Sequence, residues 1–152
     1  MLRSLLAGFA LLALAACAST PASRVDAPSG AAQSAASHAL KMVGKPYRPA
    51  GASPSTGFDC SGLVQFSFRQ AGVAVPRSTQ EQRRASARVG VSNLKRGDLL
   101  FFDQEGKKNS HVGIYLGEGR FVHAPSSGKQ VRTDRLDAPY WKKHLSEVRR
   151  FA

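Results

Sequence analysis

The chain has 152 residues, of which 42% are hydrophobic and 21% charged, which suits one globular domain with its own core and argues against general disorder. Two cysteines are too few for a disulfide scaffold or a four-cysteine zinc site. Lys and Arg number 22 against 10 Asp and Glu, so the net charge of +12 leads us to expect an anionic partner.

A secretory signal is predicted at the start of the chain. Arg3 supplies a positive charge, an apolar run extends from Leu5 to Leu14, and two alanines then precede Cys17. This run is too short to span a bilayer permanently. The sequence LAAC at 14–17 resembles a bacterial lipobox, which implies that residues 1–16 are a removed signal peptide and that Cys17 carries lipid. The alternative is a plain signal peptide with an incidental cysteine.

Export would decide what the positive charge meets. An exported protein rarely encounters nucleic acid, so the expected partners are cell-wall polymer and acidic lipid headgroups, not nucleic acid. Ala18 follows Cys17 where an inner-membrane retention signal would favour Asp, so we expect a periplasmic lipoprotein anchored to the outer membrane. Solvation of the surface is the simpler explanation for many of the scattered basic residues.

Residues 17–32 are rich in Ala, Ser and Pro and predict a flexible tether, which leaves 33–152 as the domain. Within the domain, an Ala-rich helix is predicted to end near Val43, and the Pro- and Gly-containing span that follows it is predicted to be a loop. A second helix is predicted from Cys60 to Ala71 with Asp59 as its N-cap, and a third, mostly polar helix over 76–89 with Ser78 as a possible cap.

The second half of the chain changes to a β pattern. Short β-favouring runs separated by Gly, Asp, Asn and Ser occupy 98–103, 111–116, 120–124, 130–133 and 147–151. Helices followed by strands predict an α+β domain in which N-terminal helices pack on an antiparallel sheet of about five strands.

Cys60 is the leading candidate for chemistry. It lies in the first turn of a predicted helix, where backbone N–H groups and the helix dipole favour a thiolate. With Cys17 lipidated, Cys60 would be a free thiol. The alternative is a small buried hydrophobic residue, as lone cysteines often are.

A catalytic thiol needs a base, and the strands offer His111 and His123, whereas His38 and His144 are expected on the surface. A three-residue turn at 117–119 would place His123 opposite Gly113 and diagonal to His111, with α-carbons about 7–8 Å apart. A two-residue turn would put the histidines on opposite faces.

In the first arrangement, one histidine acts as the base and the other orients it. The same Cys–His–His set is compatible with a catalytic zinc ion, although the spacing shows no paired ligand motif, so no metal or other cofactor is expected.

The order of motifs resembles that of the NlpC-type cell-wall endopeptidases, which are papain-like cysteine peptidases. The matching segments are GKPYR at 44–48, GFDCSGLV at 57–64, PRSTQ at 76–80, LKRGDLLFF at 94–102, HVGIYLG at 111–117 and FVHA at 121–124. The resemblance extends from about Ala39 to the C-terminus. It departs at Ala50, where the family carries a second glycine.

The resemblance implies a role for each matching residue. Cys60 would be the nucleophile, His111 the base and His123 the third, orienting residue. Tyr47 would help to bind the oxyanion, or would simply cover the core. Four further residues would contact substrate or serve as helix caps and solvated surface: Asp59, Ser61, Arg77 and Ser78. Gln82 would also line the cleft or lie on a solvated helix face.

The family hydrolyses peptide stems of peptidoglycan, commonly between γ-D-glutamate and a diamino acid, without a cofactor. The resemblance therefore implies a lipid-anchored murein endopeptidase that acts on stem peptides. Two alternatives stay open: a non-catalytic wall-binding lipoprotein, and a related hydrolase such as a cell-wall amidase or an acyltransferase.

Overall fold

The computed structural model describes residues 23–126 and 129–152. The predicted signal peptide and the lipid-attachment residue Cys17 lie outside the described residues. No helix within the described part is long and apolar enough to cross a bilayer.

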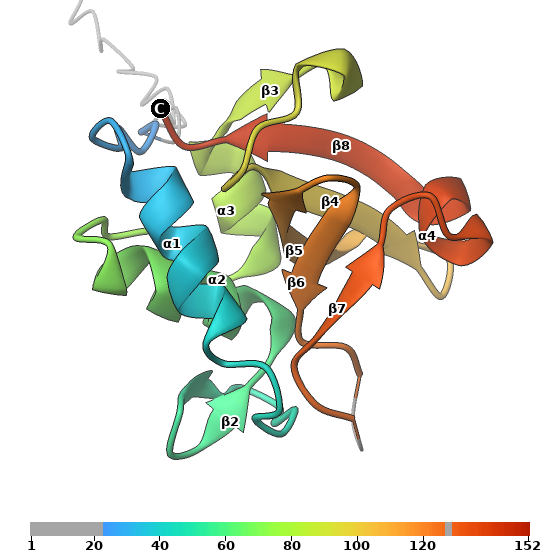
Figure 1. The fold of residues 1–152 in the computed structure, drawn as a ribbon, viewed down its shortest axis with the longest axis horizontal. Helices are drawn as coiled ribbons and strands as arrows, with labels where there is room; N and C mark the ends of the chain where they lie inside the picture. Colours follow the sequence, from blue (N-terminus) through green and yellow to red (C-terminus); the bar gives the residue numbers. More distant parts are fainter. Residues whose placement is uncertain (1–22, 127–128) are drawn as a thin grey trace, which may run out of the picture.

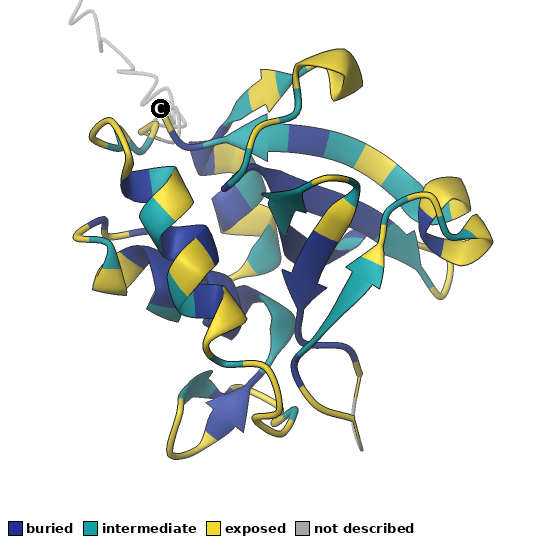
Figure 2. Cartoon of the chain, viewed as in Figure 1, coloured by how far each residue is buried: buried dark blue, intermediate teal, exposed yellow. Residues whose placement is uncertain are grey.

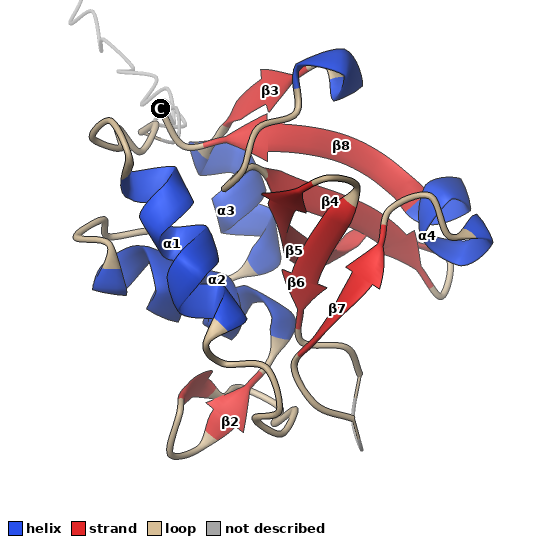
Figure 3. Ribbon diagram, in the orientation of Figure 1, coloured by secondary structure: helices blue, strands red, loops and turns tan. Residues whose placement is uncertain are grey.

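Helices cover one face of a sheet (Figure 1). Helix α1 is Ala31–Leu40, α2 is Cys60–Gln70, and α3 is Thr79–Ala85. A short 3-10 turn follows at Val91–Asn93, and the short helix α4, Pro139–His144, lies at the far end of the sheet from α1 (Figure 3).

The main sheet has the strand order β3-β8-β4-β5-β6-β7, and all of its pairings are antiparallel. A separate two-stranded ribbon pairs β1 with β2 immediately before α2. The strands are β1 Ala52–Ser53, β2 Gly57–Phe58, β3 Ala87–Val89, β4 Leu99–Gln104, β5 Lys107–Gly117, β6 Arg120–His123, β7 Arg132–Arg135 and β8 Leu145–Arg150.

The α+β class is confirmed, with corrections to its elements. The sheet has six strands rather than about five, because the segment predicted as one helix over 76–89 contains α3 and then β3. Ser86 ends α3: its backbone is extended, and its hydroxyl donates to the carbonyls of Gln82 and Arg83 at 2.8 and 3.0 Å. A side chain that bonds the preceding turn competes with continuation of the helix.

Two apolar clusters lie on opposite faces of the sheet, and Figure 2 shows buried residues along its central strands and on the helices. The larger cluster joins α1 and α2 to the sheet residues Val112, Ile114 and Val122. The smaller one gathers around Phe102, Phe121 and Trp141 of α4. Alternation along β5 and β6 therefore buries both strand faces, one against the helices and one against α4.

Part of the segment predicted as tether contacts the domain. The Val25 N–H donates to the Ala85 carbonyl at 2.9 Å, and α1 begins at Ala31 rather than after residue 32. The buried side of α1 consists of alanines, which allow close packing, and a Cβ on Gly97 would overlap Ala32. The small side chains of this segment, which suggest a flexible tether in the sequence, thus allow α1 to pack closely against the domain.

Candidate active site

Cys60 is the first residue of α2, and its position is fixed by the cap that precedes it. The Asp59 carboxylate accepts the Gly62 N–H at 2.7 Å, as predicted for an N-cap. The Asp59 N–H donates to the Gly51 carbonyl at 3.0 Å, and a Cβ on Gly62 would overlap that carbonyl. A glycine at 62 is therefore required for the loop around Gly51 to lie against the start of the helix.

The Cys60 thiol lies at the wall of a cleft and is the free cysteine of the described residues. Its sulfur lies 3.6 Å from the Thr79 hydroxyl oxygen. Burial raises the pKa of the thiol, although hydrogen bonds from Thr79 and from the backbone at Val112 and Ser61 act in the opposite direction. Burial thus opposes the thiolate that the start of a helix favours, so removal of the thiol proton needs a base.

One end of the cleft is formed by an ion pair at the start of α2. Arg77 donates to both carboxylate oxygens of Asp59, at 2.8 and 3.0 Å, and to the Ser61 hydroxyl at 2.9 Å. Ser78 caps α3 by accepting the Glu81 N–H at 3.3 Å. These four predicted residues, together with Tyr47, Cys60 and Thr79, line a cleft of about 420 Å³.

Tyr47 lies beside Cys60, and backbone contacts with residues 129–130 hold it there. Its N–H donates to the Lys129 carbonyl at 2.8 Å, and its neighbour Pro46 forms a bridge with Gln130. Burial raises the pKa of Tyr47, so its hydroxyl remains a proton donor at neutral pH.

The two strand histidines meet as predicted. Ile114 pairs with Val122, and Tyr115 pairs with Phe121, which is the register that puts both rings on one face. The turn itself has two residues, Glu118 and Gly119, both with positive φ, rather than three. An irregularity between Tyr115 and Gly117 adds the extra residue and restores the register.

His111 Nε2 lies 2.8 Å from His123 Nδ1, and the chain of contacts continues beyond them. His123 Nε2 lies 2.6 Å from the Asp134 carboxylate, which also accepts the Arg132 Nε–H at 2.8 Å. A carboxylate only accepts, so His123 donates from Nε2 and accepts at Nδ1. His111 must then donate from Nε2, and its Nδ1 keeps a lone pair.

Both imidazoles are neutral at physiological pH. Burial lowers the pKa of His111 to about 3, with a smaller contribution from His123. Burial also lowers the pKa of His123 to about 4, against the influence of Asp134, which raises it. The rings are enclosed by Trp141, whose centroid lies 5.8 Å from that of His111 and 4.8 Å from that of His123.

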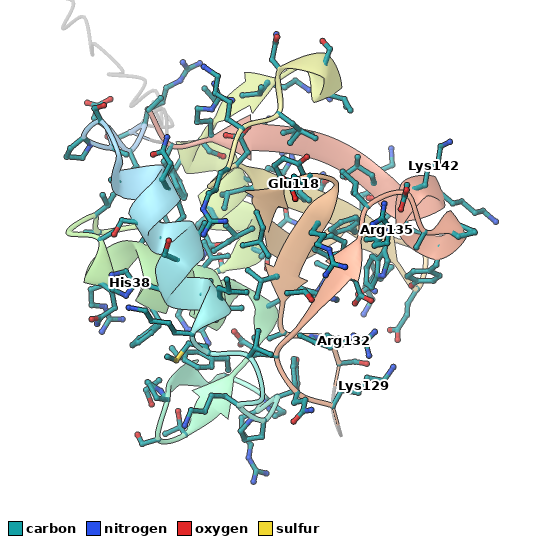
Figure 4. The ribbon with its side chains drawn as sticks, viewed as in Figure 1. His38, Glu118, Lys129, Arg132, Arg135 and Lys142 are labelled. Atoms are coloured by element: carbon teal, nitrogen blue, oxygen red, sulfur yellow. The ribbon has the colours of Figure 1, made fainter. Side chains whose placement is uncertain are left out.

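Several residues of the site were missed or misplaced by the sequence analysis. Asp134 was missed because the predicted strand stopped at Thr133, whereas β7 extends to Arg135. Gln82 does not line the cleft: it is fully buried, and its amide donates to the carbonyls of Ser61 and Pro76. His38 lies on α1, outside the site, as expected (Figure 4).

The described residues contain no cluster of three or more His, Cys, Asp or Glu side chains arranged to hold a metal ion. Three of the four imidazole nitrogens at the site are engaged in the hydrogen bonds among His111, His123 and Asp134. This arrangement suits proton transfer better than zinc ligation.

Helices that cover one face of an antiparallel sheet, with Cys60 at the start of α2 and the hydrogen-bonded pair His111–His123 on neighbouring strands, are the features of a papain-like α+β fold. The NlpC/P60 family profile matches residues 44–150, and the chain belongs to the NlpC/P60 family.

Three curated relatives are similar over the same region. The chain is 47% identical over 109 residues to the bifunctional muramidase/DL-endopeptidase CwlT of Bacillus subtilis, covering 70% of this chain and 32% of that protein. It is 40% identical over 115 residues to the murein DD-endopeptidase MepH of Escherichia coli, covering 73% and 42%. It is 45% identical over 115 residues to a γ-DL-glutamyl hydrolase of B. subtilis, covering 74% and 28%. The match thus spans less than half of each relative.

Solved structures agree. An NLP/P60 family protein of Staphylococcus aureus, described as similar to lipoprotein, superposes with a TM-score of 0.71 at 37% identity, covering 87% of this chain and 45% of that one. An NlpC/P60 family protein of Bacillus cereus gives 0.73 at 32% identity, covering 82% and 41%.

Proposed function

We propose that this protein is a peptidoglycan endopeptidase that hydrolyses stem-peptide amide bonds, between γ-D-glutamate and a diamino acid, with Cys60 as nucleophile and His111 as base. The observation that carries the proposal is the hydrogen-bonded chain His111–His123–Asp134, which leaves a lone pair on His111 Nδ1. The names of the relatives, which include murein endopeptidases and a γ-glutamyl hydrolase, support the substrate class.

In the first half of the reaction, the Cys60 thiol transfers its proton to His111 Nδ1 as the sulfur attacks the carbonyl carbon. The Tyr47 hydroxyl and the Cys60 N–H donate to the oxyanion. The imidazolium of His111 then protonates the leaving amine, and the C–N bond breaks to leave a thioester on Cys60.

In the second half, His111 takes a proton from water, which attacks the thioester carbonyl. The C–S bond breaks, and the proton returns to the sulfur, so that the acid product leaves with the enzyme regenerated. No cofactor enters either step.

Asp134 serves as a positioning residue for this chemistry. His111 becomes positively charged in the tetrahedral intermediate, while His123 accepts its Nε2–H. The carboxylate beside His123 stabilises that charge and keeps the tautomer of His123 that can accept. Its own pKa is lowered by hydrogen bonds from His123 and Arg132, although burial acts to raise it, so it stays ionised at neutral pH.

The test uses purified protein lacking residues 1–17 and defined muropeptides. Wild-type protein is expected to release cleaved stem peptides, and mass spectrometry of the new end groups separates γ-D-glutamyl cleavage from D,D-cleavage or from an amidase cut at the sugar junction. Cys60→Ala is expected to abolish release while leaving the fold intact by circular dichroism. Equal release by Cys60→Ala would remove the mechanism, and binding without cleavage by the wild type would favour a wall-binding protein.

Anchoring through lipid on Cys17 and outer-membrane localisation also belong to the proposal. The S. aureus neighbour described as similar to lipoprotein supports it. Palmitate labelling in cells is expected to mark the wild-type protein and not Cys17→Ser, and membrane fractionation then tests the location. A wild-type protein that takes up no label would overturn the anchor.

A further inference from the structure

The first described residues are held against the end of α3. The Val25 N–H donates to the Ala85 carbonyl at 2.9 Å, and residues 27–30 line a hollow of about 220 Å³ together with Lys95 and Arg150. Residues 23–25, from which the chain continues toward Cys17, therefore lie next to the end of α3 and the start of β3. Figure 1 shows β3 and the C-terminus on one side of the molecule.

The cleft beside Cys60 lies on the other side. Helix α3 ends at Ala85, and it begins at Thr79, whose hydroxyl lies 3.6 Å from the Cys60 sulfur. The seven residues of α3 separate these two ends by about 9 Å. In Figure 1, β2, which ends two residues before Cys60, lies across the molecule from β3 and the C-terminus.

Four exposed cations surround the first described residues: Arg24, Arg84, Arg88 and Lys95. Together with Val91 they are called the N-terminal face below. The side chains of Arg84 and Lys95 have no hydrogen-bond or ion-pair partner among residues 23–126 and 129–152. The Arg88 side chain is 71% exposed and lies 3.7 Å from Glu147. The charges of these side chains thus face solvent.

The carboxylates closest to these cations in the fold are mostly turned inward. Glu147 is 8% exposed and pairs with Arg83 and Arg149. Asp98 is 1% exposed and pairs with Arg150. Asp26 is exposed, so the N-terminal face presents four cations against this one carboxylate.

An apolar side chain projects from the same face. Val91 lies in the 3-10 turn between β3 and Lys95 and is 61% exposed, more than the other large hydrophobic side chains on the described surface. At a membrane surface, cations bind the anionic headgroups and apolar side chains enter the boundary between headgroups and acyl chains.

We propose that the N-terminal face docks on the anionic phospholipid surface of the membrane that holds the protein, so that the cleft beside Cys60 opens away from the bilayer. The inference rests on the proposed function, through the lipid anchor at Cys17. The eight residues from Cys17 to Val25 reach at most about 28 Å, which keeps this face near the bilayer. Charges act over about 8 Å at physiological ionic strength, so the cations of the docked face contribute most to binding.

The test uses the protein lacking residues 1–17, which carries no lipid, and vesicles with or without phosphatidylglycerol in phosphatidylcholine. The wild type is expected to sediment with the phosphatidylglycerol vesicles only. The combined changes Arg84→Gln, Arg88→Gln and Lys95→Gln should lower this partition about a hundredfold, because each cation near an anionic bilayer contributes about fivefold.

The matched control removes three exposed cations elsewhere, with the same change in net charge. Lys107→Gln at the start of β5, combined with Lys142→Gln and Lys143→Gln in α4, should lower the partition less than about threefold. An equal loss in both triple variants would reduce the effect to net charge and overturn the docking face. Absence of wild-type binding to the phosphatidylglycerol vesicles would overturn it as well.

The orientation is tested by fluorescence. Val91→Trp is expected to shift its emission to the blue on phosphatidylglycerol vesicles. Val43→Trp should not shift, because this 47% exposed valine follows α1, whose ten residues span about 15 Å from the N-terminal face. The native Trp141 is nearly buried and contributes the same background to both. A shift at residue 43 and none at residue 91 would overturn the proposed orientation.

Separate readouts distinguish failure of the docking face from failure of the proposed function. The variant changed at Arg84, Arg88 and Lys95 should cleave soluble muropeptides at the wild-type rate, because none of the three lines the cleft. Vesicle binding by this face in a protein that cleaves no muropeptide, or takes up no palmitate, would refute the activity or the anchor and keep the face. A variant that loses binding to isolated peptidoglycan but keeps binding to vesicles would assign the face to wall polymer and overturn the proposal.

Discussion

The two halves of the proposed active site are built in different ways. The nucleophile half depends on contacts close in sequence: Asp59 caps the helix that starts with Cys60, and Ser78 caps the helix that starts with Thr79. The histidine half depends on the register of three strands, β5, β6 and β7. In one half a side chain is placed by its own turn, and in the other by its partners across a sheet.

The difference affects both ionisation and tolerance to change. In the nucleophile half, the ion pair between Arg77 and Asp59 is partly exposed to solvent. In the histidine half, His123 is fully buried and His111 nearly so. Substitutions at the caps are therefore expected to lower stability modestly. Substitutions in the hydrogen-bonded chain His111–His123–Asp134 are expected to affect both the chemistry and the stability in acid. The following predictions test that division.

The largest effect is expected at the base. His111→Asn should lower kcat/KM about a thousandfold or more, because the proposed mechanism then lacks the base that takes the thiol proton. His38→Asn, on the surface of α1, is the control and should retain activity. The measurement is stem-peptide release followed by chromatography. Residual activity within tenfold of the wild type would show that the histidine half does not supply the base.

The next largest effect is expected in the stability of the folded protein in acid, which depends on the two buried histidines. The pKa values of His111 and His123 are about 3 and about 4 in the folded protein, against about 6.5 unfolded, so the unfolded state binds more protons below pH 6.5. Stability is thus complete above pH 6.5 and lost as the pH falls toward these values, by about 2–4 kcal/mol between pH 7 and pH 5. Urea unfolding at both pH values measures the loss, and His123→Asn should reduce it by about half. A pH-independent midpoint would contradict the buried neutral pair.

The same division explains how much could be predicted from the sequence. Asp59 and Ser78 were predicted as caps because a cap is read within four residues. The pairing of His111 with His123 was predicted because burial of Val122 selects one register. The turn was still predicted wrongly, since a bulge compensates for its two residues. Asp134 could not be found, because its contact with His123 depends on where β7 ends, and strand ends have weak local signals.

Asp134→Asn should lower kcat about 10- to 100-fold with little change in KM, in the range found when a residue behind a reacting group is altered. Loss of the carboxylate removes an interaction that raises the pKa of His123. Because His123 is hydrogen-bonded to the base His111, the pair holds a proton less tightly, and the acid limb of kcat/KM should move to lower pH. Long-range ¹H–¹⁵N spectra should also report a changed tautomer of His123. Asp137→Asn, in an exposed pair with Arg135, is the matched control. A fall in activity with an unmoved acid limb and an unchanged tautomer would assign Asp134 a purely structural role.

The smallest effect is expected in the nucleophile half, at the cap of α3. The Ser78 hydroxyl accepts the Glu81 N–H and donates to the Glu81 carboxylate at 2.7 Å, so it both caps the helix and holds the Glu81 side chain. Ser78→Ala should lower the free energy of unfolding by about 1 kcal/mol, because the helix loses one bonded N–H at an exposed end. Ser92→Ala, at an exposed position in the 3-10 turn, should change it by less. The urea midpoint at pH 7 measures both losses. The Ser78→Ala loss should be the same at pH 5, because neither His111 nor His123 hydrogen-bonds to this cap. A loss that grows as the pH falls would mean that the two halves of the cleft are energetically coupled.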